Sequence, residues 1–489
     1  MALKALRMAG LVTLLLAYLS TTRFARNIPF HLNPPVFPAS LANFAWSASS
    51  PLGPSSSSYE QFTVRSSSSL SLADRLAFCE DAVPFSSEGD SLVLLSCDTN
   101  RRDWNTVMGP LADPFAGSGA LWILEPVPGD GGEPQVQKVE LEFPALAAGR
   151  AQFHPLGVEL LETEGESTPS GLLVINHGAD ESTIEVFSFS RPSTFAHRYK
   201  AVHTHTLRHP TFSGAPNSLA ILPGTSSFTL RFFLTHDHRF NRRTTSPFLN
   251  LANFVETVGA MALSRVDYVE VILQSQGGME PKIQVETVLP GIAFANGLAL
   301  SHDGNTLVVA STTRRELRFY AVQASTTDGA PSLSLIRVAH VPFLVDNHSL
   351  LPSTSSTDAG NSHSLTILAA GHPSYPAILS AAHKLRLSLH LPHFLSRFFA
   401  WPGLDFDWQV QSGMSWAAAV QHPRPASTKV DEPDWETVFA SHGRRAEGGF
   451  GGSTTAVGGQ AVGKSGERTT WLVVPGLYEE GVKVIRQAA

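Results

Sequence analysis

The chain has 489 residues, of which 43% are hydrophobic and only 16% are charged, and its formal net charge is −7. This composition is typical of a globular protein with much buried structure, and the negative charge argues against a nucleic-acid partner. Two cysteines, Cys79 and Cys97, are too few for a disulfide framework, and no Cys/His spacing indicates structural zinc. They could bridge neighbouring strands, but we expect two buried free thiols.

The N-terminal residues have the pattern of a targeting signal. Lys4 and Arg7 precede an apolar run from Met8 to Leu19. This run is shorter than the about 20 residues of a membrane-spanning helix but typical of a signal sequence. We therefore expect residues 1–26 to be a signal peptide or a retained N-terminal anchor, and the protein to be secreted or anchored to a membrane of the secretory pathway.

Short strands are predicted along most of the chain, because runs rich in Val, Ile, Leu and Phe alternate with Gly, Pro, Asp and Asn. Such evenly punctuated strands favour a sandwich, a barrel or a propeller, and the periodicity alone does not choose among them. In chain order the predicted strands are Ser91–Leu95, Ala120–Leu124, Val136–Glu142, Gly171–Asn176, Thr183–Ser188, Thr229–Leu234, Val266–Leu273, Lys282–Val288, Thr306–Ala310, Glu316–Val322 and Thr470–Val474.

Two long stretches fall outside this pattern. Residues 27–75 are rich in Pro and Ser, and we expect a loose segment that leads into the fold. Residues 380–432 are predicted to be an insertion. Inside it, Leu385–Phe399 could form an amphipathic helix over one face of the fold.

Polar residues that follow apolar runs offer a set of oxygen ligands. Carboxylate and amide oxygens without thiols favour a hard cation, hence calcium ahead of zinc or copper. Only a closed fold could bring these scattered residues together, and a propeller does so because each inner strand lines one tunnel. Taken singly, each is more often a turn or loop residue. The set comprises Glu80, Asp81, Asn217, Asn296, Asp346 and Asn347.

At these residues the chain resembles the serum paraoxonase/arylesterase family, six-bladed β-propellers that hydrolyse lactones and aryl esters. The similarity runs in order from about Phe78 to the C-terminus, with the insertion left over. Its most specific blocks are LLVINHGADESTIEVFSF and GIAFANGLALSHDG, and CEDAV, APNSLAIL and VPFLVDN also match. The resemblance implies that residues 76–489 form an all-β, six-bladed propeller with calcium in its central tunnel.

The resemblance also assigns metal ligands. It places a catalytic calcium on Glu80, Asn217, Asn296, Asp346 and Asn347, whose residue types all match the family. A second, structural calcium would use Asp81, the backbone carbonyl of Val158 and Ser218. The family has an aspartate where Ser218 stands, which weakens this second site.

The catalytic histidines match the family only in part. His177 corresponds to one member of the family's histidine dyad, but the motif of the other member here reads HPLG, which places Leu156 where the second histidine is expected. Leucine cannot accept a proton. His372 matches a further active-site histidine, and His154 lies two residues before Leu156. We therefore expect Glu80, His154 or His372 to act as the base.

Three smaller expectations follow. Asp237 and His238 fall in a block that lines the family's site, whereas His236 and His238 lack a third ligand for zinc. The family's disulfide has no counterpart here, so the propeller must close by strand pairing alone. The sequon at Asn347 coincides with a predicted ligand, and we expect it to be buried and unglycosylated.

The predicted function is calcium-assisted hydrolysis of a small hydrophobic ester or lactone by water. One alternative is a non-catalytic, calcium-stabilised propeller that binds a lipid or protein partner, which the change to Leu156 favours. A third reading, a propeller of the gluconolactonase or strictosidine-synthase kind, ranks lower because those proteins use fewer amide ligands. Association with a membrane or lipid would occur through the N-terminus.

Overall fold

A computed structural model describes most of the chain between residues 36 and 488. Residues 1–26, expected to be a signal or an anchor, and the predicted helix at 385–399 lie outside the described residues. The described ranges are 36–38, 40–42, 59–67, 69–71, 74–87, 89–129, 131–149, 152–162, 169–191, 198–226, 228–243, 246–273, 280–324, 329–351, 365–375, 377–379, 381–382, 413–423, 433–463 and 466–488.

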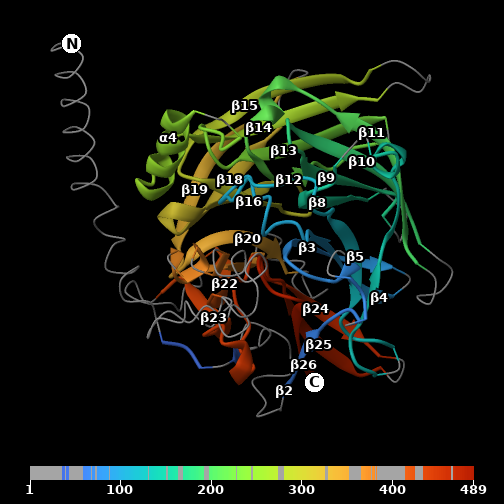
Figure 1. The fold of residues 1–489 in the computed structure, drawn as a ribbon. Coiled ribbons are helices and arrows are strands. Elements are labelled where there is room, and N and C mark those ends of the chain that lie inside the picture. Colours follow the sequence, from blue (N-terminus) through green and yellow to red (C-terminus); the bar gives the residue numbers. More distant parts are fainter. Residues whose placement is uncertain are drawn as a thin grey trace, which may run out of the picture.

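Six sheets of four or five strands, each built mainly from consecutive strands, form a six-bladed β-propeller, which confirms the predicted fold class (Figure 1). The first three blades contain β3 (Cys79–Ser87), β4 (Asp90–Cys97), β5 (Ala120–Glu125) and β6 (Gln135–Lys138); β7 (Glu140–Glu142), β8 (Pro155–Leu161), β9 (Gly171–His177), β10 (Ser182–Ser190) and β11 (Lys200–Leu207); and β12 (Pro216–Ile221), β13 (Thr229–His236), β14 (Ser264–Ile272) and β15 (Lys282–Ile292).

The other three blades follow the same plan. They contain β16 (Ala295–Leu300), β17 (Thr306–Ser311), β18 (Glu316–Gln323) and β19 (Ser332–His340); β20 (Leu344–Leu350), β21 (Leu365–His372), β22 (Ser415–His422), β23 (Trp435–Ser441) and β1 (Leu41–Ala42); and β24 (Val457–Val462), β25 (Arg468–Val474), β26 (Val482–Ala488) and β2 (Tyr59–Val64). Ten of the eleven strands predicted from the sequence are present, and the predicted strand Val136–Glu142 is divided between β6 and β7, which belong to different blades.

Apolar side chains between the blades form the core. In β4, Val93 and Leu95 pack toward β25 and β26 of the last blade, whereas Leu92 and Leu94 pack toward the second blade. Successive residues of a strand point to opposite faces, so a strand buried on both faces is apolar at every position. This explains the unbroken apolar run in β4.

The inner strands form a closed ring around the axis. Each contacts the next in the order β3, β8, β12, β16, β20 and β24, and β24 contacts β3 again. In Figure 1 these strands lie near the middle of the molecule. Their first residues therefore meet around one point, although they are far apart in the sequence.

The ring closes by strand pairing, as predicted. Strand β2 pairs with the last strand, β26, from Tyr59 opposite Gln487 to Val64 opposite Val482, so segments far apart in the sequence build the last blade (Figure 1). The prediction of a loose segment over residues 27–75 is therefore wrong for β2 and for β1, which pairs with β23. Likewise, β22 lies inside the predicted insertion but is a blade strand.

The cysteines contradict the expectation of free thiols. Cys79 and Cys97 form a disulfide, and they are direct partners across β3 and β4. Residues directly opposite each other on antiparallel strands are among the closest in a sheet, which brings the two sulfur atoms within bonding reach. The strand register that places them together was not evident from the sequence.

Helices are short in the described residues. Helix α4 (Pro247–Val258) turns its polar residues Asn253, Glu256 and Thr257 inward and leaves several apolar side chains exposed. The others are α3 (Pro144–Ala147), η3 (Pro210–Ser213), η4 (Thr312–Arg314) and η5 (Arg445–Glu447). Among the described residues, no helix is both long and apolar enough to cross a bilayer.

Candidate calcium and active site

A break in strand register positions the predicted ligands. Five of the six inner strands lose their regular pairing near their first residues, as at a β-bulge, which bends the strand and redirects side chains. The residues inside these breaks are Glu80 in β3, Leu156 and Gly157 in β8, Asn217 and Ser218 in β12, Asn296 and Gly297 in β16, and Asp346 and Asn347 in β20.

Glycine permits the close approach of two of these bulges. A Cβ atom on Gly297 would lie 2.7 Å from Cα of Asn347, which is too close for any side chain. Asn296 and Asn347 therefore come from neighbouring inner strands whose backbones touch. Such contact explains why an Asn-Gly pair stands here instead of a larger residue after Asn296.

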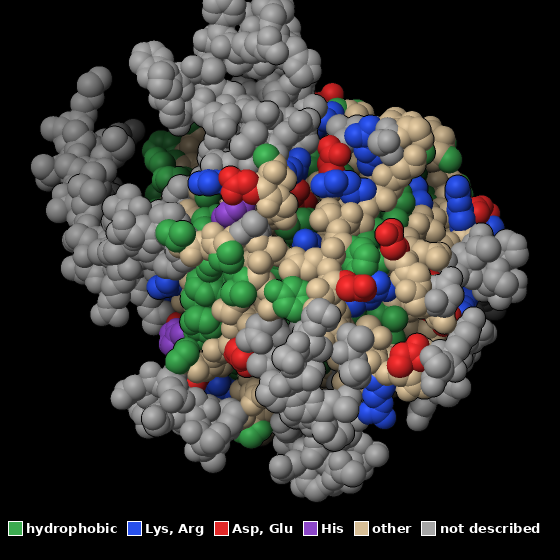
Figure 2. All heavy atoms as spheres, turned by 90° about the horizontal axis from the view of Figure 1, so that it is seen from below, with side chains coloured by type: hydrophobic (Ala, Val, Ile, Leu, Met, Phe, Trp, Pro, Cys, Tyr) green, Lys and Arg blue, Asp and Glu red, His purple; other side chains and the backbone are tan. Residues whose placement is uncertain are grey.

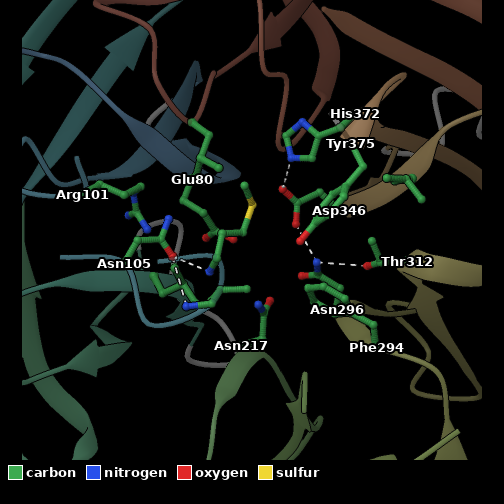
Figure 3. Close-up of a pocket in the computed structure, with 15 residues that line it drawn as sticks. Glu80, Arg101, Asn105, Asn217, Phe294, Asn296, Thr312, Asp346, His372 and Tyr375 are labelled. Carbon is green, nitrogen blue, oxygen red and sulfur yellow. Dashed lines mark hydrogen bonds and ion pairs between the residues drawn. The ribbon is translucent and has the colours of Figure 1, made fainter. Parts of the chain in front are cut away.

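The bulges converge on one pocket (Figure 3). Glu80, Arg101 and Asn105 lie on one side, Asn296, Asp346 and His372 lie on the other, and Asn217 reaches in between them. The full lining is Glu80, Arg101, Asn105, Val107, Met108, Leu156, Asn217, Phe294, Asn296, Thr312, Leu344, Asp346, His372, Tyr375 and Leu477. Asn347 lies beside it, because its Nδ2 donates to Oε1 of Glu80 at 3.0 Å.

Buried oxygen atoms in this set lack hydrogen-bond partners. Buried polar atoms are nearly always paired, so several orphans together call for an explanation. The unpaired oxygens are Oε2 of Glu80 and Oδ1 of Asn217, Asn296 and Asn347. These four atoms belong to four of the five predicted ligands of the first calcium. The fifth, Asp346, accepts from Nδ2 of Asn296 at 2.6 Å.

Negative charge accumulates at the same place. Burial raises the pKa of Glu80 well above its ordinary value, and the carboxylates of Asp346 and Asp81 raise it further. A divalent cation would offset that repulsion. Within the described residues no group of three or more His, Cys, Asp or Glu could hold a metal, since this donor set is mostly amides. Carboxylate and amide oxygens fit calcium.

The residues of the predicted second calcium do not share this feature. Asp81 accepts hydrogen bonds from the N–H groups of Ala82 and Val158 and from the hydroxyl of Thr455. Ser218 Oγ accepts from the N–H of Leu298 at 3.1 Å. The oxygen atoms of Asp81 and Ser218 are therefore already hydrogen-bonded, and Val158 directs its N–H toward Asp81. Asp81 and Ser218 offer no unpaired oxygen to a second ion.

His177 and His154 are buried but do not line the pocket. His177 donates from Nε2 to the carbonyl of Pro216 at 2.7 Å, and its Nδ1 contacts the hydroxyl of Thr106. Burial, aided by the charge of Arg243, lowers the pKa of His177 well below its ordinary value. His177 thus holds β12 just before Asn217, which is a positioning role.

His154 is also fully engaged. Its Nδ1 lies 3.0 Å from Oδ2 of Asp98 and its Nε2 lies 2.9 Å from the carbonyl of Pro114. Both nitrogens are directed at these protein acceptors, and His154 is not part of the pocket lining. Leu156, in contrast, lines the pocket from the bulge of β8, so the missing histidine leaves an apolar wall.

His372 is the predicted histidine that reaches the pocket. Its Nε2 lies 3.2 Å from Oδ2 of Asp346, and its Nδ1 is buried without a hydrogen-bond partner. A carboxylate only accepts hydrogen bonds, so Nε2 is the nitrogen that donates to Asp346, and Nδ1 has no partner among the described residues. This arrangement is that of a base held by a carboxylate.

The other predicted site residues lie elsewhere. Asp237 and His238 pair with each other at 3.0 Å, outside the pocket lining, and the ring of His238 contacts that of Phe294 at a tilted angle. No grouping of His236 with His238 and a third zinc ligand exists among the described residues. Asn347 of the sequon is buried, as expected.

Sequence reasoning missed the pocket residues of the loop between β4 and β5. Arg101, Asn105, Val107 and Met108 all line the pocket from this loop. Asn105 Oδ1 accepts from the N–H groups of Val107 and Met108 and so fixes the loop's turn. The run of polar residues at 98–106 was the available signal.

The sequence comparisons with known proteins all indicate the same family. The arylesterase family model matches residues 128–380. Curated relatives include serum paraoxonase/arylesterase 1 of Mus musculus, 28% identical over 47% of this chain and 54% of the relative, and serum paraoxonase/arylesterase 2 of Rattus norvegicus, 25% identical over 47% and 55%. Serum paraoxonase/lactonase 3 of Oryctolagus cuniculus is 25% identical over 46% and 53%. The chain spans about half the length of the curated relatives that it matches.

Proposed function

Because the chain belongs to the arylesterase family, we propose that it is a calcium-dependent hydrolase of carboxylic esters or lactones. The observation that carries the proposal is the set of four buried, unpaired oxygen atoms at the pocket. They come from β3, β12, β16 and β20, and only the closed ring places them together. Their chemistry fits calcium, and their position beside a pocket fits a catalytic ion.

The residues of the chain would divide the work as follows. Glu80, Asn217, Asn296, Asp346 and Asn347 would hold the ion. Calcium, when bound, supplies a Lewis acid that polarises the substrate carbonyl. His372, held by Asp346, would take a proton at Nδ1 from water as its oxygen adds to the carbonyl carbon. The same proton then passes to the leaving alcohol, which yields one acid and one alcohol.

The apolar wall sets the expected substrate. Leu156, Leu344, Leu477 and Phe294 line the pocket and would contact the hydrocarbon part of a small ester or lactone. On the face seen in Figure 2, the coloured residues show charges of both signs scattered among apolar and polar groups, without a basic patch. This distribution supports a small-molecule substrate over a nucleic acid.

The test is hydrolysis of phenyl acetate and a long-chain lactone by the purified chain, with and without a calcium chelator. We expect turnover that the chelator removes and calcium restores. In the variant Asn296→Ala, both turnover and the calcium-induced rise in melting temperature should fall. A ligand at 100 times its Kd stabilises the folded state by about 2.7 kcal/mol, so the rise is measurable.

Two other outcomes would change the conclusion. Calcium-dependent stability without turnover of any ester would favour the non-catalytic propeller that binds a lipid or protein, in which Leu156 has ended the chemistry. No calcium effect on stability or turnover would remove the proposal altogether. Anchoring through residues 1–26 is a separate proposal, tested by whether the full chain sediments with membranes after expression.

A further inference from the structure

Arg101 is held rigidly at the pocket wall. It is only 4% exposed, its Nε donates to the carbonyl of Phe78 at 3.2 Å, and its Nη2 donates to the carbonyl of Pro155 at 2.9 Å. These carbonyls stand at the starts of β3 and β8. The guanidinium therefore links the first two blades, and its position does not depend on a substrate.

One end of this guanidinium has no partner. Neither an ion pair nor a further hydrogen bond joins Arg101 to any residue that the structure describes, which leaves Nη1 unused. In Figure 3, Arg101 lies on the same side of the pocket as Glu80 and Asn105. The positive charge of Arg101 acts on the buried carboxylate of Glu80, and Nη1 is left to bind a further acceptor at the pocket.

The charges around the pocket leave a positive excess once a divalent cation is bound. Glu80 and Asp346 are the carboxylates of the lining, and calcium would offset both. Among the residues of the lining Arg101 then keeps its positive charge, and the buried carboxylate of Asp81 lies outside the lining. Arg242 adds to the excess, because its Nε is also buried without a partner and its charge acts on Tyr375 of the lining.

From this geometry we propose that Arg101 is a specificity-determining residue that binds a carboxylate carried by the substrate. The substrate class would be an apolar ester or lactone with one further carboxylate group. Arginine suits this role because its fixed N–H groups match a carboxylate, and the surrounding apolar wall strengthens the attraction. The inference rests on the proposed hydrolase function of the same pocket.

The experiment compares two substrates that differ in one charge, 4-acetoxybenzoate and methyl 4-acetoxybenzoate. Both carry the same acetyl ester, and the methyl ester group withdraws electrons more strongly than the carboxylate, so intrinsic reactivity favours the neutral substrate and a preference for the anion reports recognition. We expect the chain to hydrolyse the anionic substrate with a kcat/KM at least about tenfold higher, which corresponds to roughly 1.4 kcal/mol. In Arg101→Gln this ratio should fall to about one, because KM for the anionic substrate rises.

Controls separate recognition from folding. Arg208→Gln changes an exposed arginine paired with Glu181 and should keep the wild-type ratio. Arg101→Lys keeps the charge and should retain part of the preference. Binding of 4-hydroxybenzoate against methyl 4-hydroxybenzoate, measured by calorimetry on the calcium-loaded chain, gives a readout that needs no turnover.

The outcomes distinguish the two proposals. Equal rates for both esters in the wild type, or an unchanged ratio in Arg101→Gln, would show that Arg101 only braces the blades. If neither ester is hydrolysed but 4-hydroxybenzoate binds and Arg101→Lys weakens that binding, the hydrolase proposal fails and this inference stands. If Arg101→Gln does not fold, Arg101→Lys and the binding data still decide.

Discussion

At the scale of single residues, the histidines near the site differ in their contacts with the pocket. His177 and His154 use both ring nitrogens in buried contacts, whereas His372 keeps Nδ1 unpaired beside the pocket. The position that would complete a histidine dyad is Leu156. If the chain is a hydrolase, its base is therefore His372, and His177 acts by fixing the strand that carries Asn217.

This assignment predicts different effects for two substitutions. His372→Ala should lower kcat by about 100- to 10,000-fold, the usual contribution of a general base, and added imidazole should restore part of the rate. His177→Gln should instead lower the free energy of unfolding by roughly 1–3 kcal/mol, because the carbonyl of Pro216 loses its donor. Steady-state kinetics and urea denaturation of both variants check this.

The reverse pattern would contradict the assignment. If His177→Gln abolished turnover at unchanged stability, the proton would pass through His177 in spite of its buried contacts. Retained calcium-induced stabilisation in His372→Ala is the control, since it shows that Asp346 still holds the ion.

The candidate calcium ligands were predicted from the oxygen atoms of their side chains. Glu80, Asn217, Asn296, Asp346 and Asn347 come together, but neither their spacing nor their residue types alone distinguished them from turn residues. The resemblance to a family supplied that distinction. The resemblance did not indicate that Val158 donates its N–H to Asp81 or that His177 lies outside the pocket lining. Such contacts depend on local register, and nothing in one sequence states the register of neighbouring blades.

At the scale of secondary-structure elements, the strands that the sequence revealed lie outside the ring of inner strands. β4, β9, β13 and β17 carry unbroken apolar runs because blades cover both faces. The inner strands were not predicted, since polar residues, proline or glycine interrupt their apolar runs and five of the six lose their register at a bulge. The feature that hides these strands from a search for periodicity is the same feature that directs ligands into the pocket.

The disulfide between β3 and β4 is a second property that required the register. It closes a loop with a sequence separation of 18 residues. A loop of this size stabilises the folded state by about 3 kcal/mol through the entropy of the unfolded chain. We expect the double variant Cys79→Ser, Cys97→Ser to lose about 2–4 kcal/mol in urea denaturation at equal pH and calcium.

Wild-type protein treated with a reductant is the matched comparison and should lose a similar amount. Titration of two thiols in the native, untreated protein would show that the bond is absent in solution. Because Cys79 directly precedes Glu80, the double variant should also bind calcium more weakly.

At the scale of the whole molecule, the residues proposed to hold calcium lie together only because the ring is closed. Its ligands span residues 80 to 347, and the blade between β20 and β3 contributes none of them. That last blade still holds the site together, since the N–H of Asn347 donates to the carbonyl of Thr454, and the hydroxyl of Thr455 donates to the carbonyl of Glu80. Opening the ring there would release two ligand strands at once.

This dependence makes β2 a sensitive point, since it is the strand by which the N-terminal part of the chain completes the last blade. Val64 is buried in the core between the last and first blades, whereas its neighbour Thr63 points to solvent. Val64→Asp would bury a charge and should lower the free energy of unfolding by roughly 3 kcal/mol or more. Thr63→Asp should change it by less than about 0.5 kcal/mol.

Calcium binding should follow the same pair of variants. If closure by β2 supports the site through Thr454 and Thr455, Val64→Asp will need more calcium for half-maximal protection against heat, and Thr63→Asp will not. Equal stability of the two variants would mean that β2 does not close the ring in solution. Lower stability with unchanged calcium affinity would mean that the inner strands hold their register without the last blade, and the ligands would then depend on their bulges alone.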